Sequence, residues 1–150
     1  MKRTNNKNGF TLIEVMIAVL ILAVGMMAVA ALLNMSITGN IFSRDGTIAV
    51  ELAQEMLDRV RTNAGSQPDF YNNIDTSGAC GGTEPAVGDC NQWKARLASS
   101  GLVGAKGTVT VVKDAPIAKS ATVRVTITWG AVPTASHYVT FTTIVSTWLS

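Results

Sequence analysis

The carboxylate of Glu14 lies near the start of the longest apolar stretch of the sequence. No residue from Val15 to Ser43 is charged, so Glu14 has no cation within reach along a helix. Inserting a carboxylate in a membrane helix costs roughly 2.5–3.5 kcal/mol, and such a group usually has a function and a partner. A cut before Phe10 would create an α-amino group as that partner, because Phe10 and Glu14 are i and i+4 on one helix face.

Few other residues could form a reactive or metal-binding site. Cys80 and Cys90 bracket nine residues, which is no redox motif, and with His137 as the single histidine they make no convincing zinc site. Outside the cytoplasm this spacing favours a disulfide. His137 lies in an expected strand, and no phosphate loop, HExxH or paired-carboxylate motif occurs. We therefore expect a protein that is not an enzyme and holds no metal or cofactor.

Charge and composition narrow the function classes further. The formal charge is +2, but Lys2, Arg3 and Lys7 in the first nine residues carry no compensating acid. The rest of the chain is close to neutral, which disfavours nucleic-acid binding through a broad basic face. Charged residues make up 15% of the chain, against about 25% in typical soluble domains. A basic N-terminus before an apolar stretch is typical of a segment that stays on the cytoplasmic side of a membrane.

The apolar stretch is long enough to span a bilayer. Val15–Leu33 contains one glycine and no polar residue, and as a helix it would be about 28 Å long, close to the ~30 Å hydrocarbon core. A cleavable secretory signal, cut near Ala28, Ala30 or Ala31, is one alternative, and a simple signal anchor is another. Neither alternative explains Glu14.

The segment Gly9-Phe10-Thr11-Leu12-Ile13-Glu14-Val15 resembles the processing motif of type IV prepilins and type II secretion pseudopilins. The resemblance covers residues 1–35. It implies a leader peptide (residues 1–9) that a prepilin peptidase removes after Gly9, and N-methylation of Phe10 by the same enzyme. It also implies that Glu14 sets the register between subunits and that residues 10–35 form the transmembrane part of a long helix.

The following residues continue the helix as an amphipathic half (residues 36–65). Apolar residues recur at helical spacing, and their pattern predicts packing against a sheet: Ile48, Ala49, Leu52, Ala53, Met56, Leu57 and Val60. Glu55 and Arg59 are expected to pair on the solvent side. Because no proline lies between Phe10 and Ser66, we expect a smooth helix with Gly25 and Gly39 as its weak points and Gly65 after its end.

The remaining residues (66–150) are expected to form a globular head. Residues 64–92 are predicted to be loop, with a short helix at Asn91–Ser99. Alternating apolar residues predict strands at Thr108–Lys113, Ser120–Trp129 and Tyr138–Thr147, with a turn at Gly130–Pro133. Val139, Phe141 and Val145 are expected to face inward. The prediction is an α+β, pilin-like fold in which a long N-terminal helix packs on a small antiparallel sheet.

The segment Glu51–Asn63 is similar to the post-membrane helix of PilV-type minor pilins, as are the cysteine-bracketed loop and the strand that ends in Trp129. This resemblance implies a minor subunit that acts in pilus initiation or at the tip, with other minor and major pilins and an inner-membrane assembly platform as partners. The protein would first lie in the inner membrane with a periplasmic head, and then in a surface pilus. A type II secretion pseudopilin and a signal-anchored envelope domain that binds a ligand without polymerising remain alternatives.

Overall fold

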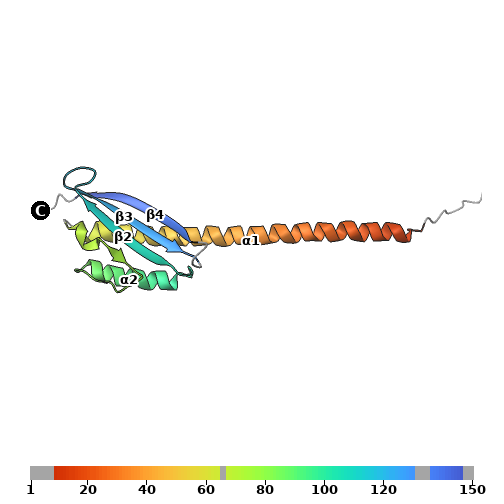
Figure 1. Cartoon of the computed structure of the whole chain (residues 1–150), viewed down its shortest axis with the longest axis horizontal. Coiled ribbons are helices and arrows are strands. Elements are labelled where there is room, and N and C mark those ends of the chain that lie inside the picture. The colour runs from red at the N-terminus through yellow and green to blue at the C-terminus, as the bar shows by residue number, and fades with distance from the viewer. Residues whose placement is uncertain (1–8, 65–66, 131–135, 147–150) are drawn as a thin grey trace, which may run out of the picture. The chain divides into compact units, whose positions relative to one another are not determined.

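The computed structural model describes residues 9–64, 67–130 and 136–146. The chain divides into two compact units, Met1–Phe42 and Ser43–Ser150, and one helix, α1 (Leu12–Asn63), contributes to both. Figure 1 shows the elements that follow. They are a 3-10 helix η1 (Pro68–Tyr71), strand β1 (Ile74–Asp75), helix α2 (Ala86–Ser99), and strands β2 (Lys106–Lys113), β3 (Ser120–Trp129) and β4 (His137–Ser146).

The described part of the first unit consists of Gly9, Phe10, Thr11 and the first part of α1. The helix runs through Gly25 and Gly39 without interruption, which confirms the expectation from the absence of proline. Each of these glycines costs up to about 1 kcal/mol of helix propensity. The long run of Leu, Met and Ala around them outweighs this cost and keeps the helix continuous.

In the second unit, the apolar stripe of α1 forms one side of the hydrophobic core. The predicted stripe is confirmed, because its members are buried from Ala49 to Val60 and Ile48 packs against them half-buried. The predicted ion pair between Glu55 and Arg59 is confirmed, at 2.9 Å, but its predicted position on the solvent side is wrong. Both side chains are only 22% exposed, because α2 covers this face of α1.

The other side of the core is an antiparallel sheet with the strand order β1-β2-β3-β4, whose three long strands lie side by side in Figure 1. The α+β fold is confirmed. Strand β3 has the predicted bounds, β2 begins two residues earlier than predicted, and β4 begins at His137. The end of the predicted last strand, Thr147, lies outside the described residues, as do Gly65 and most of the turn after Gly130.

The predicted loop over residues 64–92 is partly wrong. It contains η1 and β1, and α2 begins at Ala86 rather than at Asn91. Trp93 of α2 is fully buried and donates a hydrogen bond from Nε1 to the Leu52 carbonyl of α1 at 3.0 Å. The missing side chain of Gly107 in β2 leaves room for the Trp93 ring, which a Cβ at this position would overlap.

Candidate functional site

The first part of the candidate site is the junction between Gly9 and Phe10. Both residues are exposed and precede α1, so their backbone lies outside regular secondary structure. Apart from Gly9 and its two neighbours in the chain, no described residue has an atom within 4 Å of the position that a Cβ on Gly9 would take. A protease needs an accessible backbone, and the backbone of Gly9 and Phe10 is accessible. The basic residues of the predicted leader lie outside the described residues.

The start of α1 places Glu14 next to this junction. The Thr11 carbonyl accepts hydrogen bonds from the amides of Glu14 at 3.1 Å and Val15 at 3.3 Å, and the Thr11 hydroxyl accepts a second, longer one from Glu14. Thr11 therefore caps the helix. Glu14 in the first turn also places a negative charge where the helix dipole favours it.

Phe10 and Glu14 lie on the same side of the helix, as their spacing predicts. They line one shallow hollow of the surface, together with Val15, Ala18, Val19 and Leu22. The other side chains that line this hollow are apolar, so the Glu14 carboxylate is the one charged group in it that a cation could bind. Phe10 lines the same hollow as the Glu14 carboxylate, and its backbone nitrogen is the atom that a cut after Gly9 would convert to an α-amino group.

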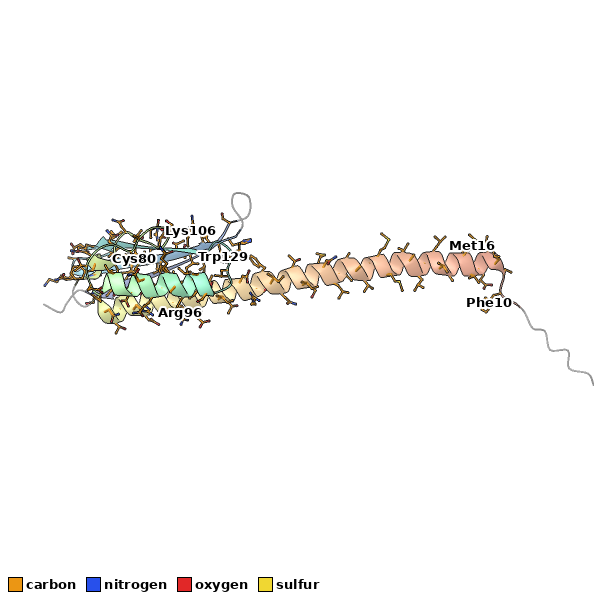
Figure 2. The ribbon with its side chains drawn as sticks, turned by 90° about the horizontal axis from the view of Figure 1, so that it is seen from below. Phe10, Met16, Cys80, Arg96, Lys106 and Trp129 are labelled. Carbon is orange, nitrogen blue, oxygen red and sulfur yellow. A yellow bond between two sulfur atoms is a disulfide. The ribbon has the colours of Figure 1, made fainter. Side chains whose placement is uncertain are left out.

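The N-terminal half of α1 is apolar and exposed. Every residue from Phe10 to Phe42 is exposed, and Figure 2 shows the side chains projecting from all sides of this stretch. Its most apolar window has a mean hydropathy of 2.9 and is 0% buried, so by length and composition the helix could cross a membrane. Such a surface is stable only when lipid or other apolar helices cover it.

A second polar cluster lies in the head, where α1 meets α2. Asp89 of α2 is 6% exposed. Its carboxylate accepts hydrogen bonds from Nη1 of Arg59 at 2.9 Å, from Nδ2 of Asn63 at 2.8 Å and from the Tyr71 hydroxyl. Arg59 also donates to Glu55 at 2.9 Å. These residues come from α1, η1 and α2, so the cluster joins three elements.

The cluster changes the protonation of its members. Burial favours the neutral form of Asp89, but the hydrogen bonds from Tyr71, Asn63 and Arg59 outweigh it and hold the pKa of Asp89 below its usual range. Burial and the hydrogen bond to Asp89 raise the pKa of Tyr71 above its usual value. At neutral pH the cluster therefore contains an ionised carboxylate, a neutral phenol and a guanidinium cation, which is a stable structural arrangement.

Comparison with known proteins gives one match. Residues 4–30 match the family model described as the prokaryotic N-terminal methylation motif. The match supports a type IV prepilin-like protein. Neither the comparison with curated proteins nor that with solved structures gives a match.

The match spans the predicted cleavage junction and Glu14, so the methylation motif and the bare apolar helix occur in one segment. The roles of Gly9, Phe10 and Glu14 remain predictions. In a prepilin-like protein, cleavage on the N-terminal side of the apolar run leaves the helix with the mature chain. That outcome distinguishes it from a secretory signal, whose apolar segment is lost.

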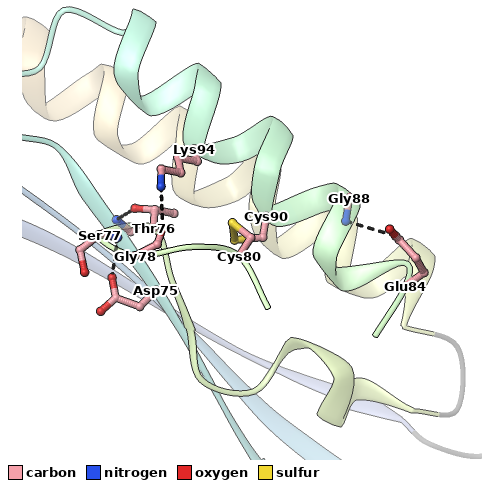
Figure 3. Close-up of a disulfide and its surroundings, with 10 residues drawn as sticks. Asp75, Thr76, Ser77, Gly78, Cys80, Glu84, Gly88, Cys90 and Lys94 are labelled. Carbon is pink, nitrogen blue, oxygen red and sulfur yellow. Dashed lines mark hydrogen bonds between the residues drawn. A yellow bond between two sulfur atoms is a disulfide. The ribbon is translucent and has the colours of Figure 1, made fainter. Parts of the chain in front are cut away.

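Cys80 and Cys90 form a disulfide, and no described cysteine is free. Figure 3 shows that it ties the loop after β1 to α2. Nearby, Nζ of Lys94 donates to the Gly78 carbonyl at 2.5 Å and holds the same loop against α2. Among the described residues, no group of three or more His, Cys, Asp or Glu side chains could hold a metal ion.

Sequence reasoning did not find the Asp89 cluster. The three residues that donate hydrogen bonds to Asp89 lie 18 to 30 residues from it in sequence, and Asp89 itself follows Gly88 in a segment with loop-like composition. The one sequence feature that could have indicated the cluster is the presence of Arg59 and Asn63, four residues apart, in the Glu51–Asn63 segment. Both side chains donate hydrogen bonds to the Asp89 carboxylate, so this part of α1 helps to hold α2 in place.

Proposed function

We propose that this chain is a minor pilin subunit of a type IV pilus, acting in pilus initiation or at the tip. The observation that carries the proposal is the exposed Gly9–Phe10 junction directly before a capped, bare apolar helix with Glu14 in its first turn. The methylation-motif match at residues 4–30 supports it. The PilV-like segment Glu51–Asn63 favours the minor-pilin class over a type II secretion pseudopilin.

Processing by a prepilin peptidase would remove residues 1–9 and produce an α-amino group on Phe10, which the enzyme methylates. A methylated amine keeps its positive charge at neutral pH. In a bilayer or a helical bundle, this amine is the cation that Glu14 lacks elsewhere in the apolar stretch. Pairing offsets the desolvation of both groups.

The same pairing gives Glu14 its role in assembly. In an apolar core, only one vertical offset between neighbouring helices places the carboxylate of one subunit beside the amine of another. A single buried polar residue specifies register in this way in coiled coils. The bare surface of α1 would be covered first by inner-membrane lipid and later by the helices of other minor and major pilins, with an inner-membrane platform driving the transfer.

The basic leader places the N-terminus in the cytoplasm and the head in the periplasm, because positive residues flanking a membrane helix stay inside. An oxidising periplasm agrees with the Cys80–Cys90 disulfide. The protein is thus a single-pass inner-membrane protein before assembly and part of a surface pilus afterwards.

The Glu14→Leu variant tests the assembly role. For a simple membrane anchor, this change removes an insertion penalty of about 3 kcal/mol and is neutral or favourable. For a pilus subunit it leaves a neighbour's amine unpaired in an apolar core. We expect Glu14→Leu to be cut normally and to accumulate in the membrane, yet to be absent from sheared pili in immunoblots.

The matched control is Met16→Leu, an apolar exchange two residues along the same exposed turn, which should enter pili at the wild-type level. Wild-type incorporation of Glu14→Leu would contradict the proposed role of Glu14. It would favour the anchored envelope domain instead.

A further inference from the structure

The outer face of the sheet, which is the side turned away from the hydrophobic core, carries a regular array of hydroxyl groups. Along β2, β3 and β4 the side chains alternate between the core and this face. The register of the strands arranges the outer side chains in rows that cross the sheet, from the row of Lys106 to the row of Val112. Threonine is the commonest residue in these rows, and one row consists of Thr108, Thr126 and Thr140.

Most of these hydroxyls have no partner in the described part of the protein. The Oγ1 atoms of Thr126 and Thr140 lie 3.0 Å apart and share one hydrogen bond, and the Thr122 hydroxyl donates to the Ala115 carbonyl at 2.7 Å. Four other threonines of the outer face form no side-chain hydrogen bond with a described residue: Thr108, Thr110, Thr128 and Thr142. Their hydroxyls can both donate and accept hydrogen bonds.

Arg124 places a guanidinium among these hydroxyls. Its cross-strand neighbours are Thr110 on β2 and Thr142 on β4, and the next residues on the same side of β3 are Thr122 and Thr126. The Arg124 side chain is exposed, and no described residue forms a hydrogen bond or an ion pair with it. An arginine in this state can bind a carboxylate through two parallel hydrogen bonds.

The charges around the outer face leave Arg124 as its binding cation. Strands β2, β3 and β4 contain no acidic residue. Asp75 lies beside Thr108 on β1, so β2 separates it from β3. Hydrogen bonds from Ser77 and the charge of Lys106 lower the pKa of Asp75. Lys106 therefore has an acid nearby, whereas Arg124 has none on its own strand or on the two strands that flank it.

Many neutral hydroxyls around few charges define the ligand. A nucleic acid needs many cations on one surface, and this face has two, Lys106 and Arg124. A protein partner needs an apolar or aromatic centre. Here the apolar residues Val112 and Ile144 lie in the end row, on either side of Thr122. A chain of sugars that carries a carboxylate matches the face better, because it also combines many hydroxyls with few charges.

We propose that the outer face of the sheet binds an acidic polysaccharide. Arg124 pairs with a sugar carboxylate, and the hydroxyls of Thr110 and Thr142 bond to hydroxyls of the same sugar and of its neighbours. The array repeats at about 5 Å across the strands and about 7 Å along them, a spacing comparable to the size of a sugar ring. Tyr138, 73% exposed in the row of Lys106, offers an aromatic ring on which a further sugar can pack.

The test uses the full chain in detergent micelles and oligomers of polygalacturonate, in which each sugar carries a carboxylate. We expect saturable binding in isothermal titration calorimetry, and no binding of the fully methyl-esterified oligomer, which has the same sugars without their charge. Arg124→Gln should weaken binding about tenfold, because the charged pair is lost. Thr142→Val replaces a hydroxyl by a methyl group of similar size and should weaken binding about threefold.

The matched control is Lys113→Gln, which removes the same charge from the other side of the sheet. Lys113 is 59% exposed and lies opposite Ala121, which is buried in the core. This variant should bind within about twofold of wild type.

Four results would overturn the proposal: no binding by wild type, equal binding of the esterified oligomer, equal loss in Lys113→Gln and Arg124→Gln, or wild-type binding by Arg124→Gln. Tighter binding of a single-stranded oligonucleotide of equal charge would overturn it in favour of nucleic acid. None of these readouts depends on processing or assembly, so the proposal and the proposed function can fail separately.

Discussion

Asp89 of α2 connects this helix to α1. Its carboxylate accepts hydrogen bonds from Arg59 and Asn63 on α1 and from Tyr71 on η1. A buried charge of this kind is stable only while its partners remain. The ionised side chain of Asp89 therefore helps to hold α2 on α1, together with the Trp93–Leu52 hydrogen bond and the Arg96–Glu55 ion pair.

This dependence predicts a pH effect on stability. The pKa of Asp89 is lowered in the folded protein, so its contribution is fully present above the unfolded pKa of about 3.9 and is lost as the pH falls through the folded value. We expect Asp89→Asn to reduce the free energy of unfolding by about 3 kcal/mol at pH 7. Urea denaturation followed by tryptophan fluorescence measures it. The difference from wild type should shrink at pH 3.

Asp58→Asn is the matched control for Asp89→Asn. The Asp58 side chain is 71% exposed and, among the described residues, forms an ion pair with Arg61 on the same helix, so its loss should cost no more than about 0.5 kcal/mol. If the two variants were equally stable at pH 7, the carboxylate of Asp89 would have no special role.

At the scale of secondary structure, patterns with a regular period were predicted and tertiary contacts were not. Strand β3 alternates strictly, and its predicted bounds are those of the structure. The start of α2 could not be predicted, because Gly88 and Asp89 are poor helix formers. The disulfide of Cys90 and the contacts of Asp89 hold them in place. Strand β1 has two residues and depends entirely on pairing with β2.

The contact between α2 and the sheet gives a second prediction. Gly107→Ala places a methyl group where the ring of Trp93 lies. Because this ring is fully buried and fixed by its hydrogen bond to Leu52, it cannot move freely. We expect a loss of about 1–3 kcal/mol in the free energy of unfolding, measured by urea denaturation.

Gly81→Ala provides the comparison for Gly107→Ala, because nothing lies within 4 Å of its Cβ position. Its stability should equal that of wild type within about 0.5 kcal/mol. A stable Gly107→Ala protein would show that α2 can shift away from β2 without cost.

At the scale of the whole molecule, the head buries its apolar side chains in its own core, whereas the apolar part of α1 needs lipid or other helices to cover it. Among the described residues, those buried in the core lie at or after Ala49, whereas α1 before Phe42 is exposed and mostly apolar. The long apolar helix could be predicted from sequence, because hydropathy defines it, whereas cleavage at the Gly9–Phe10 junction stays a prediction. The Asp89 cluster could not be predicted, since its members are distant in sequence.

The central claim is that the chain is cut between Gly9 and Phe10 and keeps its apolar helix. Intact-mass and N-terminal analysis of the protein purified from cells that contain a prepilin peptidase tests it directly. We expect a mature protein that begins with N-methylated Phe10, and an uncut protein in cells without the peptidase. A start at Met1 in the presence of the peptidase, or a start after Ala28, Ala30 or Ala31, would contradict the claim.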